Sequence, residues 1–175
     1  HDCGTSAAMA TCPPRLASGR DRAQARAMSD YILSEGLQEA ERGEVVALLR
    51  EYEKQIGVSL SFQDFAAELA GLPGAYAPPG GTLILARGAR GAALAGCVAV
   101  RALPAAAHQC EMKRLYVRAE ARKSGLGRRL ALAAIVAGRR LGYRTICLDT
   151  LPSMQAAQAL YASLGFRRVG IGDGE

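Results

Sequence analysis

Two stretches in the first half of the chain repeat apolar residues at helical spacing. In residues 37–56 the apolar positions follow at i, i+3, i+4, i+7 and i+11, which predicts a helix that ends before Gly57. A second helix is predicted from Ser61, whose hydroxyl can cap it together with Asp64, to a stop near Gly71. The apolar positions of the first helix are Val45, Leu48, Leu49, Tyr52 and Ile56.

The rest of the chain alternates between strand-like and helix-like segments. Apolar runs bounded by glycine and proline predict strands, and helical periods between them predict further helices. The predicted strands are residues 82–86, 97–101, 109–117, 145–149 and 166–169, and the predicted helices are residues 125–141 and 153–164. A helix separates strands 109–117 and 145–149, so these two should be parallel, and 166–169 should pair with 145–149.

This order predicts an α/β fold, an α+β mixed sheet with helices on both faces: N-terminal helices, a β-meander, then β-α-β-α-β. Residues 28–175 are expected to form one domain with one core. Residues 1–27 lack a sustained period, so we expect a disordered, dispensable extension; a transit peptide or upstream sequence translated in frame are alternatives. No run approaches the roughly 20 apolar residues of a membrane span, and we expect a cytoplasmic protein without a membrane partner.

The net charge of +6 is concentrated in one short segment. Residues 113–129 carry seven basic side chains against the single acid Glu120, so the rest of the chain is balanced. A nucleic-acid binder would more often spread its basic residues over a face, with aromatic residues between them, and we expect no nucleic-acid partner. The segment fits either a compact ligand with several phosphates or a solvated basic helix start.

The cysteines and histidines do not suggest a metal site. Cys97, Cys110 and Cys147 lie in apolar, strand-like runs and should behave as small buried apolar residues. With two histidines in the chain and no metal-ligand spacing around Cys3 or Cys12, we expect no metal.

The join between strand 109–117 and the following helix carries the candidate chemistry. A helix N-terminus has unpaired N–H groups and partial positive charge, and glycines let the backbone close around an anion. The pattern Arg-x-x-Gly-x-Gly at Arg122–Gly127 therefore predicts a pyrophosphate site. It lacks the Walker spacing, and Leu130 stands where a dinucleotide fold needs its third small residue.

Three blocks of the chain resemble the GNAT acetyltransferases. They are the Gly-rich segment Arg122-Lys123-Ser124-Gly125-Leu126-Gly127, the preceding strand Glu111-Met112-Lys113-Arg114-Leu115-Tyr116-Val117, and Leu160-Tyr161-Ala162-Ser163-Leu164-Gly165-Phe166. The blocks stand in the family's order and spacing. The resemblance departs at Met154, where relatives often have Asn, and after Gly165-Phe166, where relatives commonly continue into two strands.

The resemblance implies an N-acetyltransferase that uses acetyl-CoA and a primary amine of a small molecule or peptide. Backbone groups near Leu115, Tyr116 and Val117 would pair with the pantetheine arm, and the loop would bind the pyrophosphate. The loop residues concerned are Arg122, Lys123, Ser124, Gly125, Leu126, Gly127 and Arg128. A non-catalytic acyl-CoA-binding module of the same fold is the alternative function.

Two residues are the catalytic candidates that the resemblance implies. Tyr161 would protonate the leaving thiolate, although its position on an apolar helical stripe also fits a core tyrosine. Glu111 would take the proton of the amine, whose pKa is about 10.4, directly or through water. A surface glutamate paired with Lys113 explains Glu111 equally well. The sheet edge left by the last strand predicts either a homodimer that covers this edge or a fold that is only marginally stable in isolation.

Overall fold

The structure, a computed structural model, describes residues 30–57, 59–60, 64–89, 91, 93–104 and 106–169 together with the backbone of residues 7–11. Its strands are β1 (Ala7–Thr11), β2 (Tyr31–Glu35), β3 (Thr82–Gly88), β4 (Leu94–Ala102), β5 (Gln109–Val117), β6 (Thr145–Thr150) and β7 (Phe166–Val169). Its α-helices are α2 (Arg42–Ile56), α3 (Phe65–Ala70), α4 (Leu126–Arg140) and α5 (Gln155–Ser163). Short 3-10 turns are η1 (Glu39–Glu41), η3 (Gly74–Tyr76) and η4 (Ala119–Ala121).

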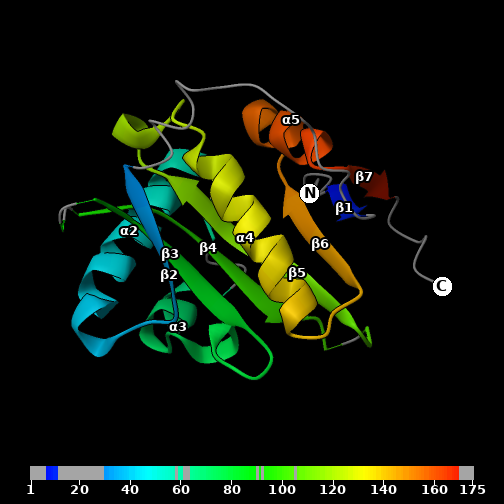
Figure 1. Ribbon diagram of the computed structural model, residues 1–175, viewed down its shortest axis with the longest axis horizontal. Coiled ribbons are helices and arrows are strands. Elements are labelled where there is room, and N and C mark those ends of the chain that lie inside the picture. The colour runs from blue at the N-terminus through cyan, green and yellow to red at the C-terminus, as the bar shows by residue number, and fades with distance from the viewer. Residues whose placement is uncertain are drawn as a thin grey trace.

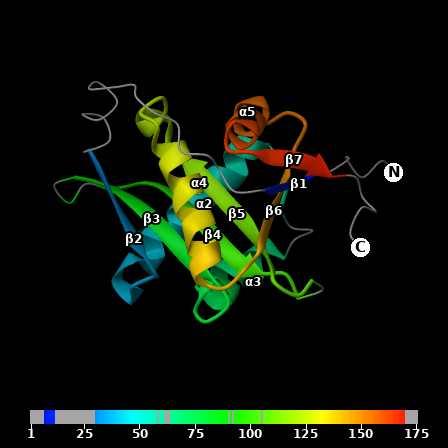
Figure 2. The ribbon, with the colours of Figure 1, turned by 45° about the vertical axis from the view of Figure 1, so that its right-hand side comes forward.

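All seven strands form one mixed sheet in the order β2-β3-β4-β5-β6-β1-β7. The pair β5 and β6 is parallel, as the intervening helix α4 requires, and the other pairs are antiparallel. Helices α4 and α5 lie on one face and α2 and α3 on the other, so the sheet is covered on both sides (Figures 1 and 2). The expected fold class is therefore confirmed.

Each face of the sheet has its own apolar core. On the α4 side, the helix buries one stripe, Leu126, Leu130, Ala134 and Ala137, against the inward residues of β3 to β6. On the other side, Val45, Leu48 and Leu49 of α2 pack with Phe65 and Leu69 of α3. The helical periods in the sequence marked these stripes because residues three and four apart share a face.

Two elements in the N-terminal half differ from the expectation. Strand β2 precedes the helices and was not expected, because it is an edge strand whose burial alternates only weakly and whose apolar signal is short. Helix α3 begins at Phe65 and not at Ser61: Asp64 occupies its N-cap position with φ of 55° and makes no capping bond. Ser61 lies outside the described residues.

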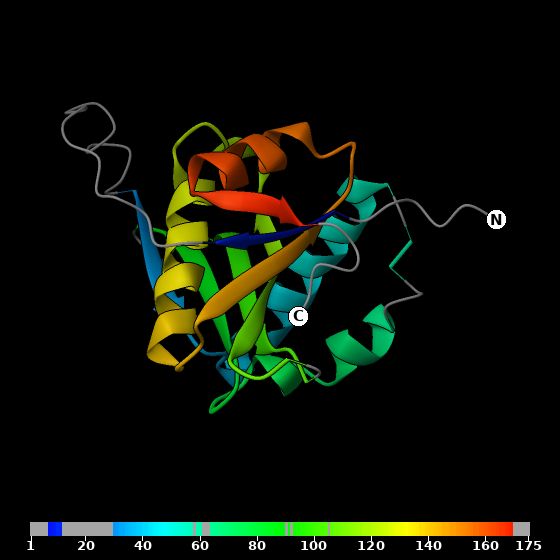
Figure 3. The same ribbon diagram turned by 90° about the vertical axis from the view of Figure 1, so that its right-hand side faces the viewer.

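The N-terminal segment also contains an unexpected strand. Within residues 1–27, expected to be disordered, Ala7–Thr11 form β1 between β6 and β7 (Figure 3), so for these five residues the expectation is wrong. The rest of that segment lies outside the described residues. As a result β7 pairs with β1 and not, as expected, with β6.

Candidate active site

Strands β5 and β6 separate part-way along their length. Their parallel pairing covers only Gln109, Cys110 and Glu111 against Thr145, Ile146 and Cys147, although β5 continues to Val117 and β6 to Thr150. Figure 1 shows both strands starting near the α4–β6 connection and pointing apart. Beyond Glu111 the two strands therefore present backbone groups that do not pair with each other, which is what an added extended chain requires.

A β-bulge lies in β5 just beyond the point of separation. Cys97 pairs with Tyr116 and Ala99 with Lys113, so Val98 faces the two residues Arg114 and Leu115. Arg114 has φ of 57°, a left-handed conformation that is unusual for a residue with a side chain. Bulges bend a strand and redirect its side chains, and this one turns Arg114 toward α2 and α3.

Arg114 is buried and forms the centre of a polar network. Its guanidinium donates from Nε and Nη2 to Glu68 of α3 at 2.8 and 2.6 Å, and Glu68 also accepts from the Tyr76 hydroxyl at 2.9 Å. The guanidinium carbon lies 5.0 Å from the ring centre of Phe65 and 5.9 Å from that of Tyr52. This bidentate pair joins α3 to the bulge.

We expect Glu68→Gln to destabilise the fold strongly near neutral pH. Burial acts to raise the pKa of Glu68, but the bonds and charge of Arg114 outweigh it, so the pKa is lowered from 4.5. The pair thus contributes stability above pH 4.5, which is lost as the pH falls through the lower folded-state pKa. Removing the carboxylate leaves a buried unpaired cation, a cost of about 3 kcal/mol. Thermal melts at pH 7 and pH 3 should show a difference from the parent that shrinks in acid.

The matched control for that substitution is Glu39→Gln. Glu39 pairs with Arg42 three residues away, and the Glu39 side chain is 83% exposed. Because exposed pairs contribute little, this variant should melt like the parent at both pH values. Equal effects of the two substitutions would contradict a structural role for the buried pair.

The Gly-rich loop forms the N-terminus of α4. Gly125 is the N-cap with φ of 84°, and the first backbone bond of the helix runs from Arg129 N–H to the Gly125 carbonyl. The Ser124 hydroxyl accepts from Leu126 N–H at 3.3 Å, whereas the N–H groups of Gly127 and Arg128 have no acceptor among the described residues. Unpaired donors at a helix start fit a pyrophosphate.

The charge around this loop is smaller than the sequence suggests. Arg114 is neutralised by Glu68 and Arg118 by Glu51, at 2.8 Å. Arg122 and Arg128 bond to neutral groups, Val117 carbonyl and Gln55 in one case and the Ser163 hydroxyl in the other. Lys123 is exposed. Arg122, Lys123 and Arg128 are thus three cations around the helix start that have no acidic partner in the described structure.

Tyr161 of helix α5 belongs to the apolar core on the α4 side of the sheet, together with Met112 of β5 and Leu148 of β6. The ring is 6% exposed and packs against Phe166 of β7, with ring centres 5.6 Å apart. Burial, and to a smaller degree Tyr52 of α2, raise the pKa of Tyr161. Its hydroxyl has no hydrogen-bond partner among the described residues, so it is a protonated donor that the fold leaves unused.

Glu111 lies at the point where β5 and β6 separate. It is 6% exposed, and Arg101 of β4 binds it through Nε at 2.8 Å and Nη2 at 2.7 Å. Lys113 lies 3.7 Å away on the same face, the pairing that the sequence offered as an alternative to catalysis. Burial lowers the pKa of Lys113. Arg101 therefore fixes the orientation of the Glu111 carboxylate. If Glu111 acts as a base, it does so between the cations of Arg101 and Lys113.

A cysteine nucleophile is disfavoured at this place. Cys147 pairs across from Glu111, and its thiol donates to the Cys110 carbonyl at 3.3 Å. Burial and the nearby acids Glu111 and Asp149 raise the pKa of Cys147 to about 11, so the reactive thiolate is scarce at neutral pH. Cys110 on the neighbouring strand behaves alike, with burial raising its pKa to about 12.

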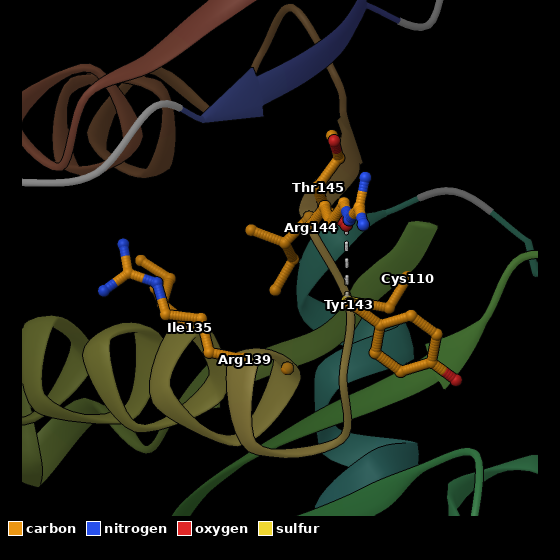
Figure 4. A pocket seen from close by; sticks show the side chains of 8 residues that line it. Cys110, Ile135, Arg139, Tyr143, Arg144 and Thr145 are labelled. Carbon is orange, nitrogen blue, oxygen red and sulfur yellow. Dashed lines mark hydrogen bonds between the residues drawn. The ribbon is translucent and has the colours of Figure 1, made fainter. Parts of the chain in front are cut away.

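Two hollows lie near these elements. One of about 270 Å³ is lined by Asp64, Glu68, Tyr76 and Arg101, and the Arg101 side chain also binds Glu111. The other, of about 300 Å³, lies at the C-terminal end of α4 beside Cys110, Arg139 and Tyr143 (Figure 4). This second hollow contains none of the predicted site residues, because it sits at the opposite end of α4 from the Gly-rich loop.

Within the described ranges, no group of three or more His, Cys, Asp or Glu side chains could hold a metal ion. In the same part of the chain, the helices are too short or too polar to cross a membrane.

Comparison with known proteins identifies the family. The acetyltransferase (GNAT) family matches residues 40–166. An uncharacterized N-acetyltransferase of Schizosaccharomyces pombe is 43% identical over 120 residues, 69% of this chain and 72% of the yeast protein. The chain belongs to the GNAT acetyltransferase family. An uncharacterized N-acetyltransferase of Escherichia coli is 35% identical over 60 residues, 34% of this chain and 36% of that protein.

Solved GNAT structures share the fold. An acetyltransferase of the GNAT family from Staphylococcus aureus superposes with a TM-score of 0.69 at 20% identity, covering 83% of this chain and 89% of that one. An acetyltransferase from Streptococcus agalactiae gives 0.68 at 16% identity, with 83% and 88% covered. These likenesses extend the match from the motif blocks to the arrangement of sheet and helices.

Several residues around the candidate active site were not found from the sequence. Arg101 holds Glu111 and Glu68 holds Arg114, but these partners lie 10 and 46 residues apart in the chain. Tyr52 was assigned to a helical apolar stripe, and its ring lies 5.9 Å from that of Tyr116 beside the candidate cofactor strand. The sequence offered one indication of these contacts, which is a charged residue within an otherwise apolar strand. Glu111 and Arg114 are both residues of this kind.

Proposed function

We propose that this GNAT protein transfers an acetyl group from acetyl-CoA directly to a primary amine of a small molecule or peptide. The observation that carries the proposal is the pair of unpaired backbone surfaces: the separated edge of β5 and the free N–H groups at the start of α4. They lie in sequence on either side of one short loop, so one extended ligand with a diphosphate end could use both.

The backbone of β5 would hold the cofactor arm, and the loop would hold its phosphates. Leu115 lies in the bulge and Tyr116 and Val117 follow it, in the part of β5 that no longer pairs with β6. Gly127 and Arg128 offer N–H groups, and Arg122, Lys123 and Arg128 add positive charge. A Cβ atom added at Gly125 would meet nothing within 4 Å, so the space in front of the helix start is open.

Two side chains would transfer protons during the reaction. Tyr161 keeps its proton because burial raises its pKa, and it can donate to the sulfur that leaves. Glu111 would accept the amine proton, either directly or through a water held between it and the Arg101 side chain. The thiol of Cys147 is engaged with a carbonyl, which favours direct attack by the amine over a covalent enzyme intermediate.

The test of the proposed function is a screen of primary amines with acetyl-CoA, in which release of the free thiol is followed. We expect release that depends on both the amine and the protein. Tight acetyl-CoA binding by calorimetry without release for any amine would favour the alternative, a non-catalytic binding module. Absence of acetyl-CoA binding would contradict both.

Glu111→Gln is expected to reduce the rate most at low pH, where the acceptor amine is most fully protonated and depends most on a base. The general-base contribution corresponds to a fall of about 10²-fold. The measurement is kcat/KM for an active amine between pH 6 and pH 10. A profile parallel to that of the parent would leave Glu111 as the ion-pair partner of Arg101 and Lys113 only.

A further inference from the structure

Strand β1 is paired along both of its edges. On one side Ala7, Ala8, Met9 and Ala10 lie opposite Thr150, Asp149, Leu148 and Cys147 of β6, and on the other side residues 8–11 lie opposite β7. Figure 3 shows β1 as the dark blue strand between orange β6 and red β7. Both contacts are antiparallel, so β1 joins two strands that do not pair with each other.

Without β1, the sheet would contain a gap one strand wide. Neighbouring strands are about 4.8 Å apart, so β6 and β7 would face each other across roughly 10 Å. Each would then present unpaired N–H and C=O groups toward the gap, which is costly away from water and makes a template for an extended peptide.

The chain can reach this gap from within one molecule. Residues 12–29 connect Thr11 to Asp30, next to β2 on the far side of the sheet. From β2 to β1 there are five strand spacings, roughly 24 Å, whereas 18 residues can extend up to about 60 Å. A strand from the same copy can therefore occupy the gap.

The gap also bears on the position of Tyr161. Helix α5 lies between β6 and β7 in the chain, and Phe166 of β7 packs on the Tyr161 ring. Arg168 of β7 donates to Gln158 of α5 at 2.6 Å. In the described part of the chain, β1 is the strand that β7 pairs with, so β1 anchors the element that supports Tyr161.

We infer that β6 and β7 form a binding slot for an extended peptide strand, that residues 7–11 of the same chain occupy it, and that this occupancy positions Tyr161. The ligand class is a short peptide of mostly small, uncharged residues that pairs through its backbone on both sides. The sequence Ala-Ala-Met-Ala-Thr has this character. The statement on Tyr161 rests on the proposed function, whereas the statement on the slot does not.

The experiment removes β1 from the chain and supplies it again as a separate peptide. A chain of residues 28–175 is compared with the full chain, with and without a synthetic peptide of residues 4–14. We expect the shortened chain to melt about 10 °C lower, to bind the labelled peptide by fluorescence anisotropy, and to regain its melting temperature when the peptide saturates it. Turnover with an active amine should fall and recover in parallel.

The control peptide carries Met9→Pro. Because β1 is paired on both sides, an interior proline removes a ladder N–H whichever neighbour it faces, so this peptide should neither bind nor restore stability. Binding of both peptides alike, or a shortened chain with unchanged melting temperature, would overturn the inference.

A second pair of variants covers the case in which the shortened chain does not fold. In the full chain, Met9→Pro should lower the melting temperature and speed amide exchange in β6 and β7, whereas Ser18→Pro, outside the strand, should do neither. Equal behaviour of the two would overturn the slot. If no amine is acetylated but the peptide binds and stabilises, the proposed function fails and the slot stands.

Discussion

Gly125→Glu is expected to weaken acetyl-CoA binding by at least about 100-fold, or roughly 2.7 kcal/mol, while the protein stays folded. Gly125 is the N-cap of α4, and the substituted carboxylate would project where the pyrophosphate should bind and would repel it. Its φ of 84° adds strain for any residue with a side chain. Isothermal calorimetry gives the affinity, and circular dichroism checks the fold.

Gly142→Glu is the matched control for this variant. Gly142 follows the other end of α4, has φ of 91°, and like Gly125 has nothing within 4 Å of an added Cβ. It therefore carries the same strain and the same new charge far from the loop. Normal affinity in Gly142→Glu together with lost affinity in Gly125→Glu would support the assignment, whereas normal affinity in both would refute it.

Tyr161→Phe is expected to lower kcat by about 10²-fold with little change in acetyl-CoA affinity. The ring that packs on Phe166 is kept, and the hydroxyl removed has no partner among the described residues, so stability should not fall. Since the pKa of Tyr161 is raised, the parent should keep its acid catalyst throughout the neutral and mildly alkaline range. Steady-state kinetics and thermal melts measure the two effects.

Tyr143→Phe provides the contrast. The Tyr143 hydroxyl donates to the Gly80 carbonyl at 2.6 Å, away from the separated strands. Its loss should cost about 1 kcal/mol of stability and leave kcat unchanged. If Tyr161→Phe behaved in this way instead, Tyr161 would be a core residue and the proton donor would have to be sought elsewhere.

The elements that follow from local periodicity were predicted well. The bounds of β5 and β7 agree with the sequence interpretation, and α2, α4 and α5 agree within a few residues, since each has an apolar stripe of its own. Strand β1 has no such signal, because Ala-Ala-Met-Ala-Thr does not alternate between apolar and polar residues and its pairing depends on strands more than 130 residues away. Edge strand β2 was missed for a related reason: only part of one face is buried.

The sequence predicted the motifs of the candidate site, but not the residues that bind its charged side chains. The Gly-rich loop is a local pattern, and its backbone geometry follows from the glycine at the helix start. The bulge at Arg114 depends on a mismatch of register between β4 and β5, and its ion pair depends on α3 docking nearby. Contacts between segments that are distant in the chain produce no periodic pattern in a single sequence, so they could not be predicted from it. The roles of Tyr161, Glu111 and the loop stay predictions.

The separation of β5 from β6 has a consequence for how this enzyme can diverge. If the cofactor is held by main-chain groups of Leu115, Tyr116 and Val117, the identity of these three side chains does not decide cofactor recognition, although Glu111 and Arg114 of the same strand have roles of their own. The amine, by contrast, would meet side chains such as Asp64 and Arg101 in the hollow whose lining includes the partner of Glu111. Substitutions in that hollow could then exchange one acceptor for another while the acetyl donor stays the same.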